Sequence, residues 1–221
     1  MNRRIAGLVG CLLLLTLATG CAAKYEGGFN PTFFPRAALA PEARQVGRAA
    51  VWVRPPAEGL VYTVTRQEAL GLQVPIGHIV EEAALASVGQ TLQGGALRVN
   101  EVPVADGGFA ATLVIDAVRM ELDHEKYTAV LPLPPFITWV GATSGRVAFD
   151  LRLLDAQGRA VWSRTYDSGR ERWQRFSVTS GEEVSVAIVR MAHETAWRLS
   201  QQVAADLRDW LADERGKLRE L

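Results

Sequence analysis

The chain has 221 residues, and its 24 Lys and Arg residues are balanced by 24 Asp and Glu residues. This balance gives no net field that favours nucleic acid or draws the protein body onto an anionic membrane, so we expect no nucleic-acid partner. The length predicts one domain of ordinary size, or one domain plus a tether, and such a chain can fold around a hydrophobic core without disulfides.

The chain begins with a predicted secretory signal peptide over residues 1–20. Arg3 and Arg4 form a basic start, Ile5–Leu17 is apolar, and small residues follow up to Cys21. This order is typical of a signal peptide. The apolar run is too short for a transmembrane helix, which needs about 20 apolar residues.

The end of this segment resembles the lipobox of bacterial lipoproteins, in which the cysteine thiol receives a diacylglyceryl group and the chain is cut just before it. The resemblance implies lipidation of Cys21, although Ala18 stands where Leu is usual. Leu8–Cys11 spells a second lipobox, but too short an apolar run precedes it. Ordinary cleavage without lipid and an uncleaved anchor are the alternatives. Acyl chains such as palmitate would bind the membrane, because each buried CH₂ contributes about 0.8 kcal/mol.

Residues 21–47 are predicted to form a lipidated N-terminus and a flexible tether. They contain a Gly-Gly pair and three prolines, and they show no sustained apolar period. Their aromatic side chains either pack on the domain or dip into the lipid headgroup region, or they form a docking peptide for a partner. These residues are Phe29, Phe33 and Phe34.

Strands and a helix are predicted for the first part of the domain. Ala49–Arg54 is a compact apolar run before two prolines and predicts a strand. Leu60–Thr65 is β-branched and aromatic, which predicts a continuation of that strand or a short partner. A helix begins at Pro75, has apolar residues at three- and four-residue steps, and stops at Gly94-Gly95.

The middle of the chain predicts a run of antiparallel strands. Arg146–Asp155 has the clearest pattern, because apolar residues alternate with polar or small ones as in a half-buried strand. In Phe109–Leu122 the apolar residues occupy both parities, which predicts a central strand with both faces partly covered. Further strands are predicted at Ala96–Val104, Arg159–Tyr166 and Arg172–Val178.

The last element is a long helix with capping-box spacing at Ser180–Glu183. An apolar stripe along Ile188–Trp210, at steps of three and four residues, should cover the sheet. The expected fold class is α+β, a two-layer sandwich with a mainly antiparallel sheet covered by two helices, the C-terminal one long. Residues 48–216 would form this single periplasmic domain, and residues 217–221 a disordered tail.

The sequence shows no catalytic or metal-binding motif. None of the histidines, His78, His124 and His193, has a second His at metal-ligand spacing. Acidic residues flank His124, but neighbours on a strand point to opposite faces and do not readily converge on one ion. Acyl transfer has no visible nucleophile motif. We therefore expect no enzyme activity, metal or cofactor, and an envelope hydrolase with an unrecognised site is a third hypothesis.

Tyr127–Val140 is an uncharged stretch whose three prolines exclude a regular central strand or helix. Apolar residues in such a connection either fold back onto the core or form an exposed contact patch. We hypothesise a contact with a membrane surface, a lipid or an envelope partner, with core packing as an equal alternative. The candidate contact residues are Leu131, Leu133, Phe136, Ile137 and Trp139.

Arginines cluster in the predicted meander of strands. They could receive an anionic partner such as a lipid headgroup. Nearby carboxylates can neutralise much of this charge, so a solvated face laced with salt bridges is the favoured interpretation. The arginines are Arg146, Arg152, Arg159, Arg164, Arg170, Arg172 and Arg175.

The order of elements resembles that of small bacterial envelope lipoproteins, such as the YajG-like lipoproteins. More loosely, it is similar to auxiliary lipoproteins of transport systems and the assembly helper LptE. The resemblance lies in Cys21, the strand at Ala49–Arg54, the helix at Pro75–Leu92, the hairpin sequence at 151–162 and the closing helix. It implies a non-enzymatic role in the envelope and no active residues.

We therefore expect a lipid-anchored binding or assembly accessory at the periplasmic face of the outer membrane. Its acyl chains would contact the membrane, and an envelope protein would be its partner. Ala22 is not the Asp that signals inner-membrane retention in enteric-type lipoproteins. The alternative is a periplasmic carrier or chaperone that holds a lipid or other hydrophobic ligand in an apolar groove between helix and sheet.

Overall fold

The computed structural model describes residues 44–64, 71–102, 108–130, 137–155, 157–177 and 181–219. Within these ranges, the side chains of residues 124–130, 137–142, 172–177, 181–184 and 214–219 are not described. The predicted signal peptide, Cys21 and most of the predicted tether therefore lie outside the described residues.

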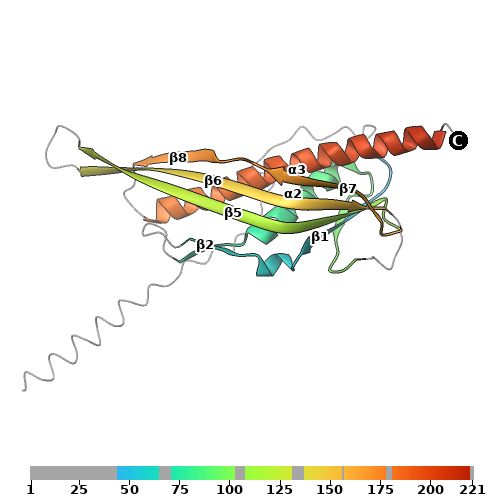
Figure 1. The fold of residues 1–221 in the computed structure, drawn as a ribbon, viewed down its shortest axis with the longest axis horizontal. Helices are drawn as coiled ribbons and strands as arrows, with labels where there is room; N and C mark the ends of the chain where they lie inside the picture. The colour runs from blue at the N-terminus through green and yellow to red at the C-terminus, as the bar shows by residue number, and fades with distance from the viewer. Residues whose placement is uncertain are drawn as a thin grey trace, which may run out of the picture.

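The described chain has an α+β fold, as the sequence predicts (Figure 1). Its first elements are β1 (Ala49–Arg54), the 3₁₀ helix η3 (Ala57–Gly59), β2 (Tyr62–Val64), β3 (Leu72–Val74) and α2 (Ile76–Thr91). Its later elements are β4 (Ala96–Arg98), β5 (Ala111–Val130), β6 (Ile137–Leu154), β7 (Ala160–Asp167), β8 (Glu171–Ser177) and α3 (Gly181–Arg219). The helix α3 thus includes residues 217–219, which the sequence assigned to a tail.

One mixed sheet contains six of the strands, in the order β4-β1-β5-β6-β7, with β8 also paired to β6. The strand β1 is parallel to both β4 and β5, whereas β6 is antiparallel to β5, β7 and β8. The strands β7 and β8 pair with different stretches of β6, Ala148–Leu154 and Val140–Gly145 respectively. A separate antiparallel pair is formed by β2 and β3.

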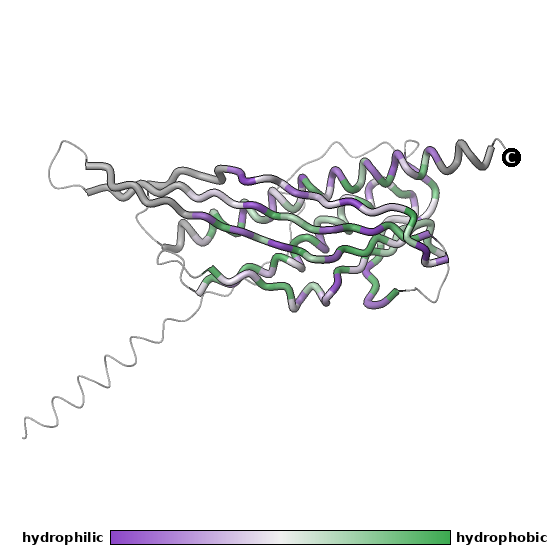
Figure 2. Tube along the Cα trace, viewed as in Figure 1, coloured by the Kyte–Doolittle hydropathy of each residue, from purple (hydrophilic) through white to green (hydrophobic). Residues whose placement is uncertain are grey.

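Both helices cover one face of this sheet, and Figure 1 shows them behind the strands. Along β6, Val147, Phe149, Leu151 and Leu153 are buried, as the alternating pattern predicts. Hydrophilic and hydrophobic segments alternate along the strands in Figure 2. Full burial of such a side chain contributes roughly 1.5–3 kcal/mol, so the interface between the layers is the main source of stability.

The helix α3 presents the predicted apolar stripe to the sheet and to α2. The residues Ile188, Ala192, Ala196, Leu199, Val203 and Leu207 are buried, and Trp210 packs against the core while partly exposed. Charged residues between them, such as Arg190 and Asp209, stay at the surface. Within the described part of the chain, neither helix is long and apolar enough to span a membrane.

The long strand β5 changes character at a β-bulge between Asp116 and Arg119. Residues 111–115 are buried on both faces, as the sequence predicts. Beyond the bulge only one face is covered, because Met120 is buried while Arg119 and Glu121 are exposed. Before the bulge the residues that face the core have odd numbers, and after it they have even numbers. The other face of the strand is then exposed to solvent.

Candidate functional site

A pocket of about 540 Å³ lies where the parallel strands β1 and β4 end. The C-terminal part of β1 contributes Trp52 and Val53, and η3 contributes Glu58. The opposite walls come from Glu81 of α2 and from Arg98 at the end of β4. Residues from β1 and η3, which are adjacent in sequence, therefore converge with residues from α2 and β4 on one cavity.

Two ion pairs that share Arg98 cross this pocket. The Nε atom of Arg98 lies 3.1 Å from Oε1 of Glu81. The same guanidinium donates a hydrogen bond from its Nη2 atom to Oε1 of Glu58. The Glu81 side chain is only 3% exposed, whereas Arg98 is 39% and Glu58 is 62% exposed. The two ion pairs thus run from the solvent to a buried carboxylate.

The position of Glu81 on α2 explains its burial. It shares a helix face with Gly77, Ala84 and Val88, at steps of four, three and four residues, and all of these are buried. Its second oxygen, Oε2, lies 3.7 Å from Nδ1 of His78, and neither of these buried atoms has a hydrogen-bond partner. The Glu81 carboxylate is therefore buried with one oxygen unsatisfied.

The two carboxyl groups of the pocket differ in pKa. Burial raises the pKa of Glu81 above its ordinary value, and the charge of Arg98 opposes this rise. The pKa of Glu58 is lowered, first by a hydrogen bond from a backbone N–H and then by Arg98. Glu58 therefore remains ionised over a wider pH range than Glu81.

The pocket suits binding by charge and hydrogen bonds. Among the described residues, no group of three or more His, Cys, Asp and Glu side chains could hold a metal ion. The lining combines two carboxylates and one guanidinium with the indole of Trp52 and the amide of Asn100. A concave site with a few convergent polar groups and a perturbed carboxyl is the usual form of a small-molecule site.

The sequence analysis did not single out Glu58, Glu81 or Arg98. A signal for Glu81 was present, because a carboxylate falls on the small and apolar face of the helix after Pro75. Its partner could not be found in the same way. Arg98 reaches Glu81 only because β4 runs parallel to β1, and this strand pairing is not encoded in local spacing.

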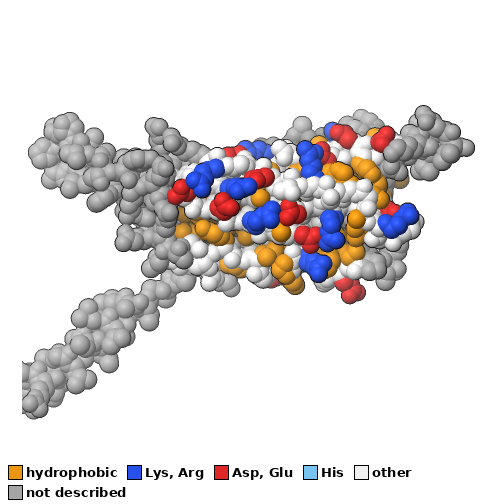
Figure 3. Space-filling model, in the orientation of Figure 1, with side chains coloured by type: hydrophobic (Ala, Val, Ile, Leu, Met, Phe, Trp, Pro, Cys, Tyr) orange, Lys and Arg blue, Asp and Glu red, His pale blue; other side chains and the backbone are white. Residues whose placement is uncertain are grey.

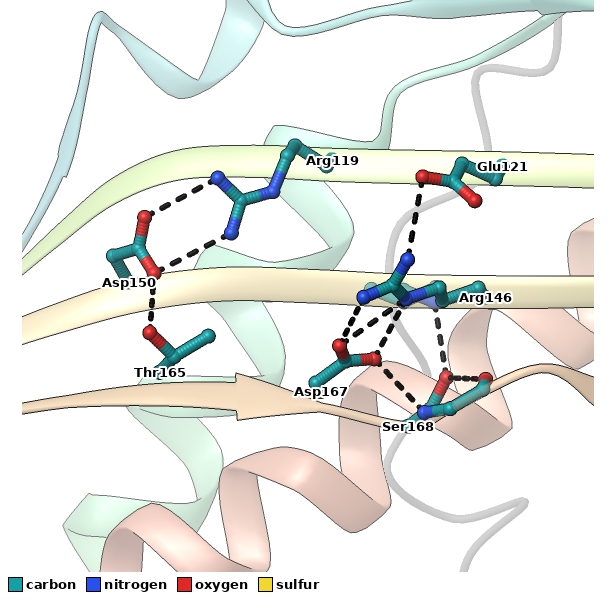
Figure 4. A network of polar contacts seen from close by, with 9 residues as sticks. Arg119, Glu121, Arg146, Asp150, Thr165, Asp167 and Ser168 are labelled. Carbon is teal, nitrogen blue, oxygen red and sulfur yellow. Dashed lines mark hydrogen bonds and ion pairs between the residues drawn. The ribbon is translucent and has the colours of Figure 1, made fainter.

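Blue and red side chains are interspersed on the open side of the sheet (Figure 3). Arg146 lies between two carboxylates, with Nε 2.9 Å from Asp167 Oδ1 and Nη1 3.6 Å from Glu121 Oε1 (Figure 4). The hydrogen bonds from Arg146 lower the pKa of Asp167 to about 2. Arg119 pairs with Asp150 across β5 and β6, at 3.3 Å.

The other described members of the cluster are paired too, which confirms the interpretation of a face laced with salt bridges. Arg172 and Arg175 have side chains outside the described residues. The remaining ion pairs are Arg152–Asp116, Arg159–Asp155, Arg164–Asp206 and Arg170–Asp123.

The predicted contact segment connects β5 to β6. These strands pair from Thr112 opposite Leu154 to Val130 opposite Ile137, so they stop on either side of the three prolines. The candidate contact residues Leu131, Leu133 and Phe136 lie outside the described residues. Ile137 and Trp139 lie on β6, but their side chains are not described. Contact through these five residues therefore stays a prediction, as does lipidation of Cys21.

The fold and the pocket together define a two-layer α+β protein with a polar cavity at the ends of two parallel strands. No protein-family model matches the chain, and no curated protein matches it. Similar solved structures include proteins from three bacteria.

A candidate lipoprotein from Caulobacter crescentus is 17% identical, with 68% of this chain and 89% of that chain covered and a TM-score of 0.40. A candidate neuraminyllactose-binding hemagglutinin homolog from Helicobacter pylori is 8% identical, covering 85% and 96%, with a TM-score of 0.39. A minor lipoprotein from Acinetobacter baumannii is 12% identical, covering 72% and 93%, with a TM-score of 0.34.

Proposed function

We propose that this protein is a lipid-anchored, non-enzymatic component of the bacterial envelope. It acts as a binding or assembly accessory at the periplasmic face of the outer membrane, with the lipid on Cys21. The observation that carries this proposal is the order of basic, apolar and small residues before Cys21. Such a chain is exported and then held at a membrane by its acyl chains, since each buried CH₂ contributes about 0.8 kcal/mol.

The strand register supports a contact at the end of the β5–β6 hairpin. Tyr127–Val130 and Ile137–Val140 are register partners, so the two halves of the uncharged segment lie side by side. Charged residues begin again immediately inward, at Lys126 on β5. An uncharged and apolar strand end is the part of a hairpin best suited to enter a membrane surface or a partner protein.

The first test concerns the anchor. Cells that produce the full-length protein are fed an alkyne-tagged palmitate, and the protein is recovered and probed for the tag. We expect label and membrane fractionation in the wild type, and loss of both in Cys21→Ser. Label that persists in Cys21→Ser, or a wild type without label, would contradict anchoring at this residue.

The second test concerns the partner. The tagged wild type is crosslinked in cells and extracted in mild detergent, and the captured proteins are identified by mass spectrometry. We expect one stoichiometric envelope protein, absent when Leu133→Ser and Phe136→Ser are combined. The matched control combines Val161→Ser and Val186→Ser, because these apolar side chains are 43% and 63% exposed elsewhere on the molecule.

Two outcomes would overturn this contact. Capture of the same partner by the Leu133→Ser and Phe136→Ser variant would move the contact away from the hairpin end. Loss of folding in that variant, seen by circular dichroism, with no selective loss of partner would return these residues to core packing. A clean wild-type protein with bound lipid would favour the carrier alternative.

The carrier alternative needs an apolar groove between the helices and the sheet. The described side chains at this interface fill the space, since Phe149 and Ile115 of the sheet and Leu199 and Leu207 of α3 are all fully buried. The pocket at the ends of β1 and β4 lies at the margin of the sheet and is lined mostly by polar groups. No observation on the described residues therefore favours a lipid carrier specifically.

A further inference from the structure

We propose that the pocket at the ends of β1 and β4 binds a small ligand through a cationic amino or guanidinium group. The inference goes beyond the proposed function and does not rest on the lipid anchor or on the hairpin contact. It is carried by the place of the cavity in the sheet, by its charge and by the presence of Trp52 among its lining residues.

The place of the cavity is one that sheets commonly use for ligands. The strands β4 and β1 run in the same direction, and β4 ends at Arg98 opposite Val51, near the carboxyl end of β1. Ligands of open sheets with parallel strands bind in the crevice beyond these ends. A volume of about 540 Å³ is within the usual range for a small-molecule site.

The charge of the lining selects a cation. Its charged members are Glu58, Glu81 and Arg98, so two carboxylates face one guanidinium. Arg98 is already engaged by both carboxylates, and an anionic ligand would have to displace them. A cation instead adds a partner to a site with an excess of negative charge, and low-dielectric walls strengthen that attraction.

The buried Glu81 carboxylate has unused hydrogen-bond acceptor sites. Arg98 contacts Oε1 of Glu81, while Oε2 lies 3.7 Å from Nδ1 of His78 and is buried without a hydrogen-bond partner. A carboxylate has about four acceptor sites on its two oxygens, so the contact with Arg98 leaves most of them unused. A small shift of the Glu81 side chain would let an N–H donor in the pocket form a hydrogen bond with its carboxylate. An apolar or anionic ligand has no such donor.

The other lining residues include Trp52, Val53 and Ala57. Indole is the aromatic ring that attracts cations most strongly. The apolar neighbours suit a short hydrocarbon chain attached to the charged group. The ligand class is therefore a small aliphatic amine or guanidine rather than a bare metal ion.

The experiment uses 1,5-diaminopentane as the probe and the full-length protein in dodecylmaltoside micelles. Binding is measured by titration calorimetry and by ¹⁹F NMR of protein labelled with 5-fluorotryptophan, in which Trp52→Phe assigns the Trp52 signal. The neutral control ligand is 1,5-pentanediol, which has the same chain without charge. We expect saturable binding of the diamine with a shift of the Trp52 signal, and no saturable binding of the diol.

Two variants test the carboxylates, and a third is their matched control. Glu81→Gln should weaken diamine binding at least tenfold, and Glu58→Gln several-fold. Glu194→Gln removes the same charge from a surface ion pair on α3 and should leave binding unchanged. Because Glu58 is largely exposed, Glu58→Gln keeps the test valid even if Glu81→Gln impairs folding, which thermal unfolding would reveal.

Several results would overturn the inference. One is the absence of saturable diamine binding in the wild type. Another is a shift confined to tryptophans other than Trp52. A third is equal affinity in Glu58→Gln, Glu194→Gln and the wild type, since this would mean that the diamine senses only surface charge.

Discussion

Ala117 is held in a backbone conformation that costs free energy. It lies in the β-bulge of β5 and has φ 50°, in the left-handed region that favours glycine. We expect Ala117→Gly to raise the free energy of unfolding by about 0.5–1 kcal/mol, because it removes the clash of the Cβ atom with the backbone. Urea denaturation of both proteins measures the difference.

The matched control is Ala160→Gly, at an exposed alanine of β7 without a positive φ. Glycine there should lower the free energy of unfolding by about 0.5–1 kcal/mol through backbone entropy alone. Equal destabilisation by both substitutions would mean that Ala117 is not strained.

At the residue scale, the sequence predicted burial well where one strand face alternates regularly. Val147, Phe149 and Leu151 follow that rule. The bulge at Ala117 could not be predicted, because apolar residues on both parities fit a fully buried strand as well as a strand that changes its inward face. Only the pairing with β6 shows that β5 is buried on both faces before the bulge and on one face after it.

At the scale of elements, α2 and η3 lie so close together that position 77 of α2 has no room for a side chain. A Cβ atom at Gly77 would lie 2.5 Å from the carbonyl oxygen of Ala57. We expect Gly77→Ala to lower the free energy of unfolding by about 1–3 kcal/mol, since backbone atoms must move apart. It should also weaken diamine binding, because η3 carries Glu58 into the pocket.

Gly89 of the same helix provides the control. An added Cβ atom there meets its nearest neighbour at 3.4 Å, which is an ordinary contact. Gly89→Ala should therefore raise the free energy of unfolding by about 0.5–1 kcal/mol through helix propensity. Urea denaturation of the two variants side by side distinguishes the predictions, and a stabilising Gly77→Ala would refute the close contact.

Element types were predictable, but their lengths and pairings were less so. The sequence predicted a strand at Arg146–Asp155, whereas β6 begins at Ile137. The added residues include Gly141 and Gly145, which have little intrinsic strand preference and are held by hydrogen bonds to β5 and β8 on either side. The pocket was missed for the same reason, since its walls meet only through parallel strand pairing.

At the scale of the whole molecule, a buried histidine couples the helix layer to pH. His193 of α3 is 5% exposed, and its Nδ1 atom lies 2.8 Å from the carbonyl oxygen of Val189. Burial lowers the pKa of His193 below its ordinary value of 6.5, and Val189 and the charge of Glu82 on α2 oppose this shift while His78 adds to it. The folded protein therefore holds this imidazole neutral where the unfolded chain protonates it.

The sign of the pH dependence follows from this difference. The contribution of His193 is complete above pH 6.5 and is lost as the pH falls from 6.5 towards the folded pKa, because the unfolded state then binds more protons. The loss is at most about 1.4 kcal/mol per pH unit. Buried Glu81 acts in the opposite direction, because its raised pKa makes stability fall as the pH rises through that value.

Urea denaturation between pH 7.5 and 5.5 isolates His193 when the wild type is compared with His193→Gln. We expect the free energy of unfolding of the wild type to fall over this range, and the curve of His193→Gln to be flatter whatever its absolute stability. His78→Gln is the control on the facing helix, at a histidine that is one-third exposed, and it should keep most of the slope. An equal slope in His193→Gln and the wild type would assign the pH dependence to other groups. His193 would then not couple the packing of α2 against α3 to pH.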